Sequence, residues 1–399
     1  MGWCVPPFFP VTAMNDSRSL DYLKTLIGFP TVTSGSNLDL IEWVRCELSR
    51  HGVPCELVPD HTGTKANLHA VVGPSDKPGI MLSGHTDVVP VAGQDWTVPP
   101  FESTERDGRI YGRGAADMKG YVACALNALI AAKQMPLSRP LHLALSYDEE
   151  IGCVGVHSLL DVLVQRITRP SLCIIGEPTS MNIALGHKGK LALRAHCRGR
   201  AGHSALAPKA LNAVHLATDF IGSLRRTQED LARHGARDDD YEIPYSTLHV
   251  GRISGGTALN IVPSLCTLDF EIRHLAADAP DEILDRLQLE ASHIVQPLKA
   301  AFPEAAIDIE TMNAYPGLNT EAATEAARLV ALLLPPSTRT FKVAFGTEGG
   351  LFTQRLGVAT VVCGPGSMDQ GHKPDEFVSI EQMRQCDGFL AKVTTTLAA

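Results

Sequence analysis

The sequence predicts an α/β fold: a layered domain with a mostly parallel central sheet, and an inserted ferredoxin-like α+β domain. Short apolar runs at 80–82 and 172–175 alternate with longer helical patterns, which is typical of layered domains with parallel strands. Near Lys188 the pattern changes, and 191–198 alternates like an antiparallel strand with one solvated face. The elements that follow have the order β-α-β-β-α-β, which is the order of a ferredoxin-like unit.

The layered domain is expected to be discontinuous and to comprise residues 16–188 and 315–399. Asp16 and Ser17 can cap a first helix, which Pro30 ends. Further helices are expected around 40–48, 118–134, 320–334 and from Ser379 onward. Strands are expected near 54–59, 66–72, 79–84, 141–147, 172–175, 340–345 and 358–363.

The inserted domain is expected to cover residues 189–314. Its long helix lies at about 210–235 and its second helix near 280–296. After the strand at 191–198, strands are expected near 244–253, 262–273 and 306–313.

Composition excludes several classes of protein. The chain has 399 residues, enough for two domains, and its 44% hydrophobic and 20% charged residues are ordinary for a globular protein. A net charge of -9 argues against a nucleic-acid-binding surface. No apolar run approaches the roughly 20 residues of a membrane-spanning helix. We therefore expect neither nucleic acid nor a membrane as a partner.

The ten cysteines are scattered, and no two form a Cys-x-x-Cys pair. This spacing favours buried, reduced thiols in a cytoplasmic protein over a disulfide framework or a thiolate zinc site. Residues 1–15 contain three prolines and no basic residue, unlike the start of a signal peptide. We expect them to form a loose extension, with Met14 as an alternative start.

His85 and Asp87 directly follow the apolar run at 80–82. A histidine at the end of a buried strand can face a cleft, and an aspartate two positions on can fix its tautomer, as around metal-bound imidazoles. Alone, this His-x-Asp pattern is equally compatible with a structural role.

Four further stretches place polar side chains beyond strand ends, where α/β folds build their sites. Each has a structural alternative: Glu149-Glu150 could be a solvated acidic loop, Glu177 a cap, and His372 a surface residue. Five such stretches together are improbable as coincidence. The four stretches are 112–120 with Asp117, 146–152 with Glu149 and Glu150, 176–179 with Glu177, and 364–372 with His372.

Two histidines and three carboxylates suit a pair of Zn²⁺-class ions that share one bridging carboxylate. Two metals about 3.5–4 Å apart activate a water and polarise a carbonyl. Glu149, beside Glu150, supplies an additional carboxylate as proton acceptor, because adjacent residues at a strand end point in different directions.

These stretches together resemble the M20 metallopeptidase family, in the right order and over nearly the whole chain past residue 16. The motifs that carry the resemblance are Gly84-His85-Thr86-Asp87, Gly114-Ala115-Ala116-Asp117-Met118-Lys119-Gly120, Asp148-Glu149-Glu150, Gly176-Glu177-Pro178-Thr179 and His372.

The resemblance implies two Zn²⁺ ions, with Co²⁺ as a substitute. It implies that His85, Asp117 and Glu177 bind one ion. Glu150, His372 and the bridging Asp117 would bind the other. It further implies that Glu149 is the general base, that Asp87 orients His85, and that the peptide bond after Asp117 is cis.

In the inserted domain the resemblance points to His203, Asn260 and Arg273. His203 would stabilise the oxyanion from across a homodimer interface formed by this domain, although a turn residue on an edge strand would look the same. Asn260 and Arg273 look like the family's substrate-binding residues, and a guanidinium suits a bidentate grip on an α-carboxylate. Arg273 could equally be a salt-bridge partner at an interface.

Residues 345–350 and 363–376 look most like the acetylornithine deacetylases of the family. This implies removal of the acetyl group from N2-acetyl-L-ornithine in arginine biosynthesis, with Glu348 recognising the side-chain ammonium. Glu348 could instead be a carboxylate favoured by a helix N-terminus. The alternatives are a related deacylase, such as a succinyl-diaminopimelate desuccinylase, an aminoacylase or a dipeptidase, and a non-catalytic metal-binding homologue.

Overall fold

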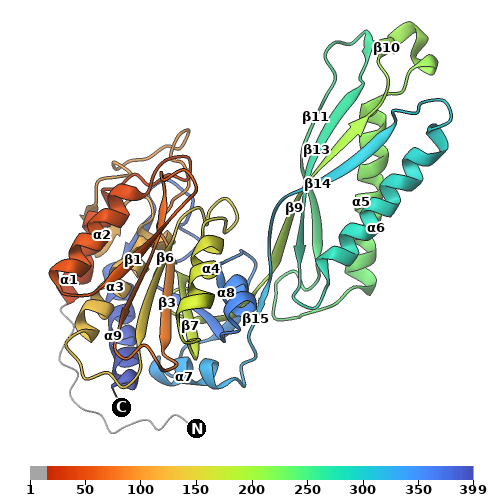
Figure 1. Cartoon of the computed structure of the whole chain (residues 1–399). Coiled ribbons are helices and arrows are strands. Elements are labelled where there is room, and N and C mark those ends of the chain that lie inside the picture. Colours follow the sequence, from red (N-terminus) through yellow and green to blue (C-terminus); the bar gives the residue numbers. More distant parts are fainter. Residues whose placement is uncertain (1–15, 399) are drawn as a thin grey trace. The chain divides into compact units, whose positions relative to one another are not determined.

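The computed structural model describes residues 16–398. The expectations for residues 1–15, with the alternative start at Met14, lie outside this range, and the capping roles of Asp16 and Ser17 concern side chains that the structure does not describe. The described chain forms two compact units (Figure 1). Unit 1 contains the described chain up to Gly186, Leu318–Val343 and the chain from Thr347 onward, and unit 2 contains His187–Gly317 and Ala344–Gly346.

Unit 1 is built on a nine-stranded sheet with the order β1-β2-β6-β3-β7-β17-β8-β15, and β16 pairs with β8. The central strands β6, β3, β7 and β17 run parallel, whereas β1, β2 and β8 pair antiparallel to their neighbours. The largely parallel sheet predicted for the layered domain is confirmed. The strands are β1 (Cys55–Pro59), β2 (Ala66–Val72), β3 (Ile80–His85), β6 (Leu141–Ser146), β7 (Leu172–Pro178), β8 (Ile183–His187), β15 (Leu318–Asn319), β16 (Thr340–Val343) and β17 (Thr360–Gly364).

Helices cover both faces of this sheet (Figure 1). On one face α3 lies between the sheet and helices α1 and α9, and nearly all its side chains are therefore buried. The opposite face is covered by α4 and α8, two helices that the sequence reading did not identify. The helices are α1 (Asp16–Ile27), α2 (Leu38–Arg50), α3 (Gly120–Ala132), α4 (Val156–Arg166), α7 (Glu325–Leu333), α8 (Gly349–Leu356) and α9 (Ile380–Leu397).

A small three-stranded sheet fixes the segment that precedes α3. It has the order β18-β5-β4, formed by Phe377–Ser379, Arg109–Tyr111 and Thr104–Arg106. Directly after β5, the Gly112 N–H donates to the carbonyl of Glu376 at 2.9 Å. The chain that carries Asp117 and the chain that carries His372 therefore run side by side. A kinked turn, η1 (Ala115–Lys119), in which Asp117 and Met118 have non-helical backbone angles, leads into α3.

Unit 2 has a four-stranded antiparallel sheet with the order β11-β13-β9-β14. Helices α5 (Ala213–His234) and α6 (Pro280–Val295) share one apolar core with this sheet. The predicted ferredoxin-like element order is confirmed. The strands are β9 (Gly189–Arg198), β11 (Thr247–Gly255), β13 (Leu265–His274) and β14 (Ala306–Tyr315), with a ribbon of β10 (Gly202–His203) and β12 (Ile261–Val262) and the 3₁₀ turns η2 (Ser204–Lys209) and η3 (Gln296–Leu298).

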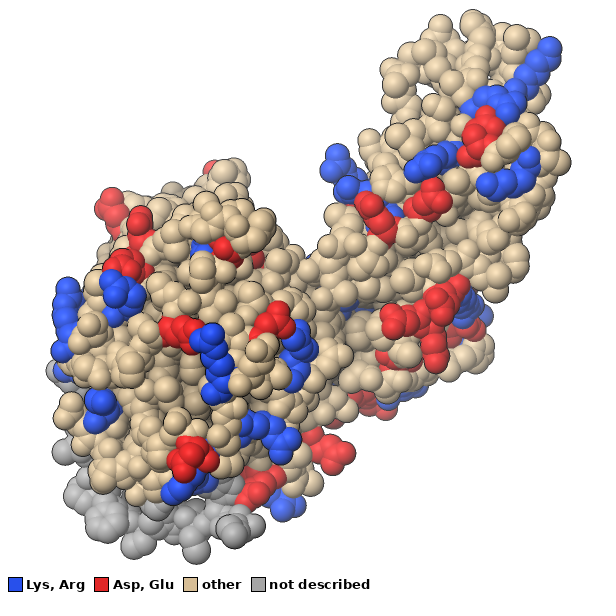
Figure 2. All heavy atoms as spheres, in the orientation of Figure 1, with Lys and Arg blue, Asp and Glu red and all other residues tan. Residues whose placement is uncertain are grey.

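Charges of both signs are interspersed on the face shown in Figure 2, without a continuous basic tract on that face. None of the described helices combines the length and apolarity needed to cross a membrane. All nine cysteines of the described chain are free thiols, most of them buried.

A buried histidine pair links β2 and β6 on the face that α4 covers. The rings of His69 and His142 stack with centroids 5.3 Å apart, and His69 Nε2 lies 3.1 Å from His142 Nδ1. Burial lowers the pKa of His69 to about 4 and that of His142 to about 3. Both rings are therefore neutral in the native state, whereas in the unfolded chain they titrate near a pKa of about 6.5.

We predict that this pair makes the protein acid-sensitive between about pH 6.5 and pH 4. In that window the unfolded state binds more protons, so the free energy of unfolding falls as the pH falls, by on the order of 1–3 kcal/mol per histidine. A His69→Gln/His142→Gln double variant should lose less stability than the wild type over this window, measured by urea unfolding. An identical pH dependence in the two proteins would contradict this assignment.

Candidate metal centre

The predicted ligands lie at the edge of the sheet where the parallel strands end. His85 is the last residue of β3, Glu150 follows β6, Glu177 lies near the end of β7, and His372 follows β17. Because neighbouring parallel strands end at the same edge, residues far apart in sequence meet there.

Asp117 lies between the two histidines. Its Oδ1 is 3.0 Å from His85 Nε2, and its Oδ2 is 3.2 Å from His372 Nε2. His85 Nε2 also lies 3.9 Å from Glu177 Oε1, and His372 Nε2 lies 2.9 Å from Glu150 Oε2. The structure therefore brings the five predicted ligands together, with one carboxylate facing both imidazoles.

Two triads within this cluster have ligand atoms that all lie within 4.8 Å of one another. One is His85, Asp117 and Glu150, and the other is His85, Glu149 and Glu177. Imidazole nitrogen and carboxylate oxygen are donors that Zn²⁺ and similar ions take in proteins. The residues thus fit a cation, and Glu149 lies as close to the donor atoms as the predicted ligands do.

The charge balance of the cluster also favours a cation. Burial raises the pKa of Glu150 to about 7, and the Asp117 carboxylate adds to this shift. Burial and neighbouring carboxylates raise the pKa of Glu149 and of Glu177 well above the usual range, although His85 opposes both shifts. Buried carboxylates that raise one another's pKa are stabilised in their charged form by a nearby positive charge.

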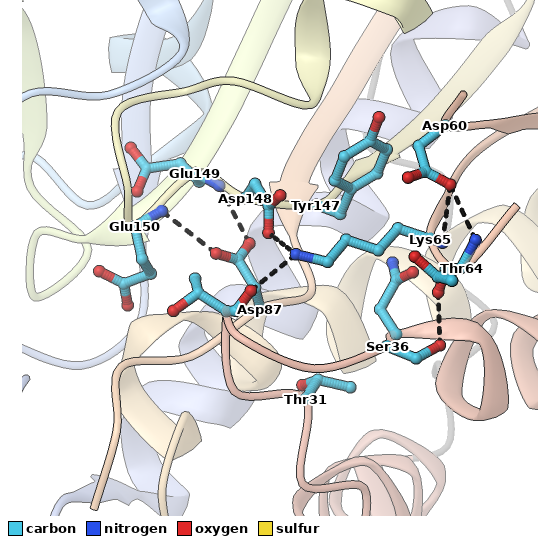
Figure 3. Close-up of polar contacts among 12 residues, drawn as sticks. Thr31, Ser36, Asp60, Thr64, Lys65, Asp87, Tyr147, Asp148, Glu149 and Glu150 are labelled. Atoms are coloured by element: carbon cyan, nitrogen blue, oxygen red, sulfur yellow. Dashed lines mark hydrogen bonds and ion pairs between the residues drawn. The ribbon is translucent and has the colours of Figure 1, made fainter. Parts of the chain in front are cut away.

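Asp87 holds the turn that carries the two glutamates (Figure 3). Its Oδ1 accepts a hydrogen bond from the Glu149 N–H at 3.1 Å, and its Oδ2 accepts one from the Glu150 N–H at 3.2 Å. His85 Nδ1 lies 3.0 Å from the main-chain oxygen of Asp87 but 3.6 Å from its carboxylate. Of the Asp87 oxygens, the one nearest to His85 Nδ1 is thus the carbonyl oxygen, whereas the carboxylate binds the backbone of Glu149 and Glu150.

Lys65 holds the same turn from the other side and was missed in the sequence. Its Nζ donates to Asp148 Oδ1 at 2.5 Å (Figure 3). It also donates to the main-chain oxygen of Thr33 at 2.6 Å. Asp148 has a positive φ of 56°, a backbone conformation that disfavours most side chains. A lysine between two strands carries no motif, so only the fold reveals this contact.

The backbone just before Asp117 has a conformation that requires a glycine at position 114. Gly114 has a φ of 81°, and a Cβ there would lie 2.7 Å from Val88 Cγ1. The peptide bond between Asp117 and Met118 is cis, as the resemblance implies.

Glu348 and Cys153 extend the cluster. Glu348 is only 1% exposed and stands at the start of α8 without capping it through its side chain. Burial raises the pKa of Glu348 to about 7, and its charge contributes to the raised pKa of Glu149. Cys153, which the sequence reading did not single out, has its Sγ 3.4 Å from Glu149 Oε1. Glu348 thus belongs to the same buried acidic group as Glu149.

The three remaining candidates belong to unit 2. His203 is exposed, and its Nδ1 accepts a hydrogen bond from the Ala205 N–H at 3.1 Å. Asn260 lies beside it, because its carbonyl accepts from the Ser204 N–H at 3.0 Å. Arg273 has partners within the unit, donating from Nε to Glu271 Oε1 at 3.0 Å and from Nη1 to the Tyr315 hydroxyl at 2.9 Å.

An acidic and imidazole cluster at the carboxyl edge of an α/β sheet fits a metal centre that could activate water for hydrolysis. A family model described as peptidase family M20/M25/M40 matches residues 81–396. The chain therefore belongs to this family, and it is a metal-dependent hydrolase of the M20 type.

Named relatives and solved structures match over nearly the whole chain. It is 33% identical to acetylornithine deacetylase of Pasteurella multocida (strain Pm70), covering 94% of this chain and 96% of that protein. It is 32% identical to acetylornithine deacetylase of Myxococcus xanthus, covering 93% of this chain and 95% of that protein. The fold resembles that of the M20 metallo-carboxypeptidase Sso-CP2 of Sulfolobus solfataricus, with a TM-score of 0.76, 18% identity and coverage of 95% and 99%. It also resembles a tripeptidase of Staphylococcus aureus, with a TM-score of 0.73, 19% identity and coverage of 96% and 99%.

Proposed function

We propose that this protein is a di-zinc amidohydrolase that converts N2-acetyl-L-ornithine to ornithine and acetate. The observation that carries the proposal is the Asp117 carboxylate between His85 and His372, with Glu149 beside them. The two relatives named acetylornithine deacetylase support the substrate, since they match over almost their full length. In this proposal the protein acts in arginine biosynthesis in the cytoplasm, and Co²⁺ can replace Zn²⁺.

The two cation subsites share Asp117. His85 and Glu177 complete the more buried subsite, since their side chains are 1% and 5% exposed. Glu150 and His372 complete the other, in which the His372 side chain is 46% exposed. In the expected domain division, residues 16–188 and 315–399 form the catalytic domain, which contains both subsites. The inserted domain, residues 189–314, then contacts the substrate and forms the dimer.

Glu149 is the proposed general base. Bound metal ions would lower the pKa of the attacking water and polarise the amide carbonyl. Asp87, through its bonds to the turn, positions the backbone from which the Glu149 side chain projects. Glu149 takes a proton from the attacking water and then gives it to the leaving amine. A carboxylate whose pKa is raised by burial suits both halves of this transfer.

Substrate contacts are proposed for four residues. Arg273 binds the α-carboxylate of the substrate through two hydrogen bonds, and Asn260 forms a hydrogen bond with the substrate. The His203 side chain of a partner subunit stabilises the oxyanion that forms during hydrolysis. Glu348 binds the side-chain ammonium of ornithine. Its burial, and the contribution of its charge to the raised pKa of Glu149, support a role at the site.

A homodimer through unit 2 is supported by exposed apolar side chains at one end of that unit. β10 pairs with β12 there, and the last residues of β11 pair with the first residues of β13. Exposed apolar side chains that gather in one region mark association surfaces. They are Leu206, Ile253, Leu259, Ile261 and Leu265.

We predict that Glu149→Ala abolishes turnover and leaves the protein with two bound metal ions per chain. The proton acceptor is removed, whereas the proposed ligands remain, so kcat should fall by at least about 100-fold. Enzyme assay and elemental analysis of the same sample measure both quantities. Loss of one metal ion in this variant would make Glu149 a ligand instead, which its place in the triad with His85 and Glu177 makes a real alternative.

We predict that Glu348→Gln raises the KM for N2-acetyl-L-ornithine about tenfold or more, because a buried contact with the ammonium is lost. N-acetyl-L-methionine, which has no side-chain cation, serves as the matched control substrate, and its KM should not rise. An unchanged KM for acetylornithine would remove Glu348 from substrate recognition.

The proposed substrate is tested with a small panel hydrolysed by the zinc- or cobalt-loaded protein. We expect kcat/KM for N2-acetyl-L-ornithine to exceed that for N-succinyl-diaminopimelate and N-acetyl-L-methionine. A preference for either of the other two would identify a related deacylase. Absence of hydrolysis in protein that holds both metal ions would indicate a non-catalytic homologue.

A further inference from the structure

A chain of hydrogen bonds connects the backbone of Asp117 to the backbone of His372 without passing through the cluster itself. It begins at Glu376, whose side chain is 1% exposed. Glu376 Oε1 accepts the N–H groups of Ala116 and Asp117 at 2.9 and 3.0 Å. One carboxylate oxygen therefore fixes the backbone that presents the Asp117 side chain.

Arg113 continues the chain and neutralises Glu376. Its side chain is also 1% exposed, and its Nη1 donates to Glu376 Oε2 at 2.7 Å and to the Lys373 carbonyl at 3.3 Å. Its guanidinium carbon lies 5.0 Å from the centre of the Trp96 ring. Since a buried, unpaired charge is very costly, this ion pair strongly constrains both side chains.

Gln94 completes the connection. Its Oε1 accepts from Arg113 Nη2 at 2.5 Å and from Trp96 Nε1 at 3.1 Å, so its amide nitrogen must point the other way. That nitrogen donates to the main-chain oxygen of His372 at 2.9 Å. The link closes into a ring, because His372 Nε2 lies 3.2 Å from Asp117 Oδ2.

The loop around Gln94 has a second contact with the His372 segment. Thr97 donates from its N–H and its hydroxyl to the two carboxylate oxygens of Asp375, at 2.9 and 2.7 Å. His372 and Asp375 both have positive φ values, 61° and 55°. Neither is a glycine, so outside contacts must hold this segment in its conformation.

We propose that Gln94 is a positioning residue that holds His372 within reach of Asp117, so that cation binding at Asp117, Glu150 and His372 depends on it. The inference rests on the proposed function, because it requires this subsite to bind a metal ion. Partners of ligands outside the coordination shell typically change metal affinity by about 10–100-fold. The half-buried Gln94 is the best member of the ring to change, since substituting Arg113 or Glu376 would leave a buried charge unpaired.

The test measures zinc affinity directly. Metal-free full-length protein is titrated with Zn²⁺ against a chromophoric chelator, which gives a dissociation constant for each ion. His372→Ala first identifies which constant belongs to the Asp117, Glu150 and His372 subsite. Gln94→Ala should weaken that constant by about 10–100-fold and leave the other within about twofold.

Two further variants separate the effect of the Gln94 hydrogen bond to His372 from other effects of changing this loop. Gln94→Glu keeps the acceptor for Arg113 but loses the donor to the His372 carbonyl, so it should weaken the same constant. Asp95→Ala removes an exposed side chain of the same loop and should change neither constant. Thermal unfolding of each metal-free variant verifies that the fold is retained.

The possible outcomes are distinct. If the wild type binds two ions and Gln94→Ala binds both with unchanged affinity, Gln94 does not position His372, and the proposed function stands. If Gln94→Ala weakens both ions equally, its role is general to the fold and the inference is wrong. If the wild type does not bind two ions, the proposed function itself fails.

Discussion

The site depends on one electrostatic constraint: several carboxylates are buried together beside only two imidazoles. Asp117, Glu149, Glu150 and Glu177 lie so close that their charges raise one another's pKa, and Asp117 escapes this only through its bonds to the two histidines. Burying like charges costs several kcal/mol per ion unless opposite charge compensates them. In the proposed function, a pair of divalent cations would supply that compensation.

The rest of unit 1 serves to hold these charges in place. Parallel strands bring His85, Glu150 and Glu177 to one edge, and carboxylates from other segments bind the backbone of two turns that carry site residues. Asp87 accepts two backbone N–H groups of the glutamate turn, and Glu376 accepts two at the Asp117 turn. In both turns a buried carboxylate accepts hydrogen bonds from two backbone N–H groups that no helix or strand partner satisfies.

Much of the fold could be predicted because its signals are local. Apolar runs marked the central strands, and a strand end followed by a histidine or carboxylate marked the site residues that the structure brings together. Helix α4 was overlooked although Val156, Leu159, Leu160 and Leu163 show helical spacing. Helix α8 had no such signal, since it begins with Gly349 and Gly350, which are poor helix formers, and it is stabilised by the burial of its apolar side chains.

The positioning residues could not be predicted from one sequence. Lys65, Gln94 and Glu376 act on segments far away along the chain, and each does so through one or two hydrogen bonds that leave no periodicity or motif. Asp87 illustrates the same limit at the level of atoms. The sequence predicts that Asp87 lies near His85. It does not predict that the Asp87 carbonyl oxygen faces the imidazole while the Asp87 carboxylate binds the backbone of the Glu149–Glu150 turn.

We propose that the side chains around Asp117 bind two neighbouring cations. Anomalous scattering at the zinc absorption edge from crystals of zinc-loaded protein tests it most directly. Two peaks about 3.5–4 Å apart are expected, one on each side of the Asp117 carboxylate. A single peak, or peaks that do not contact Asp117, would contradict it.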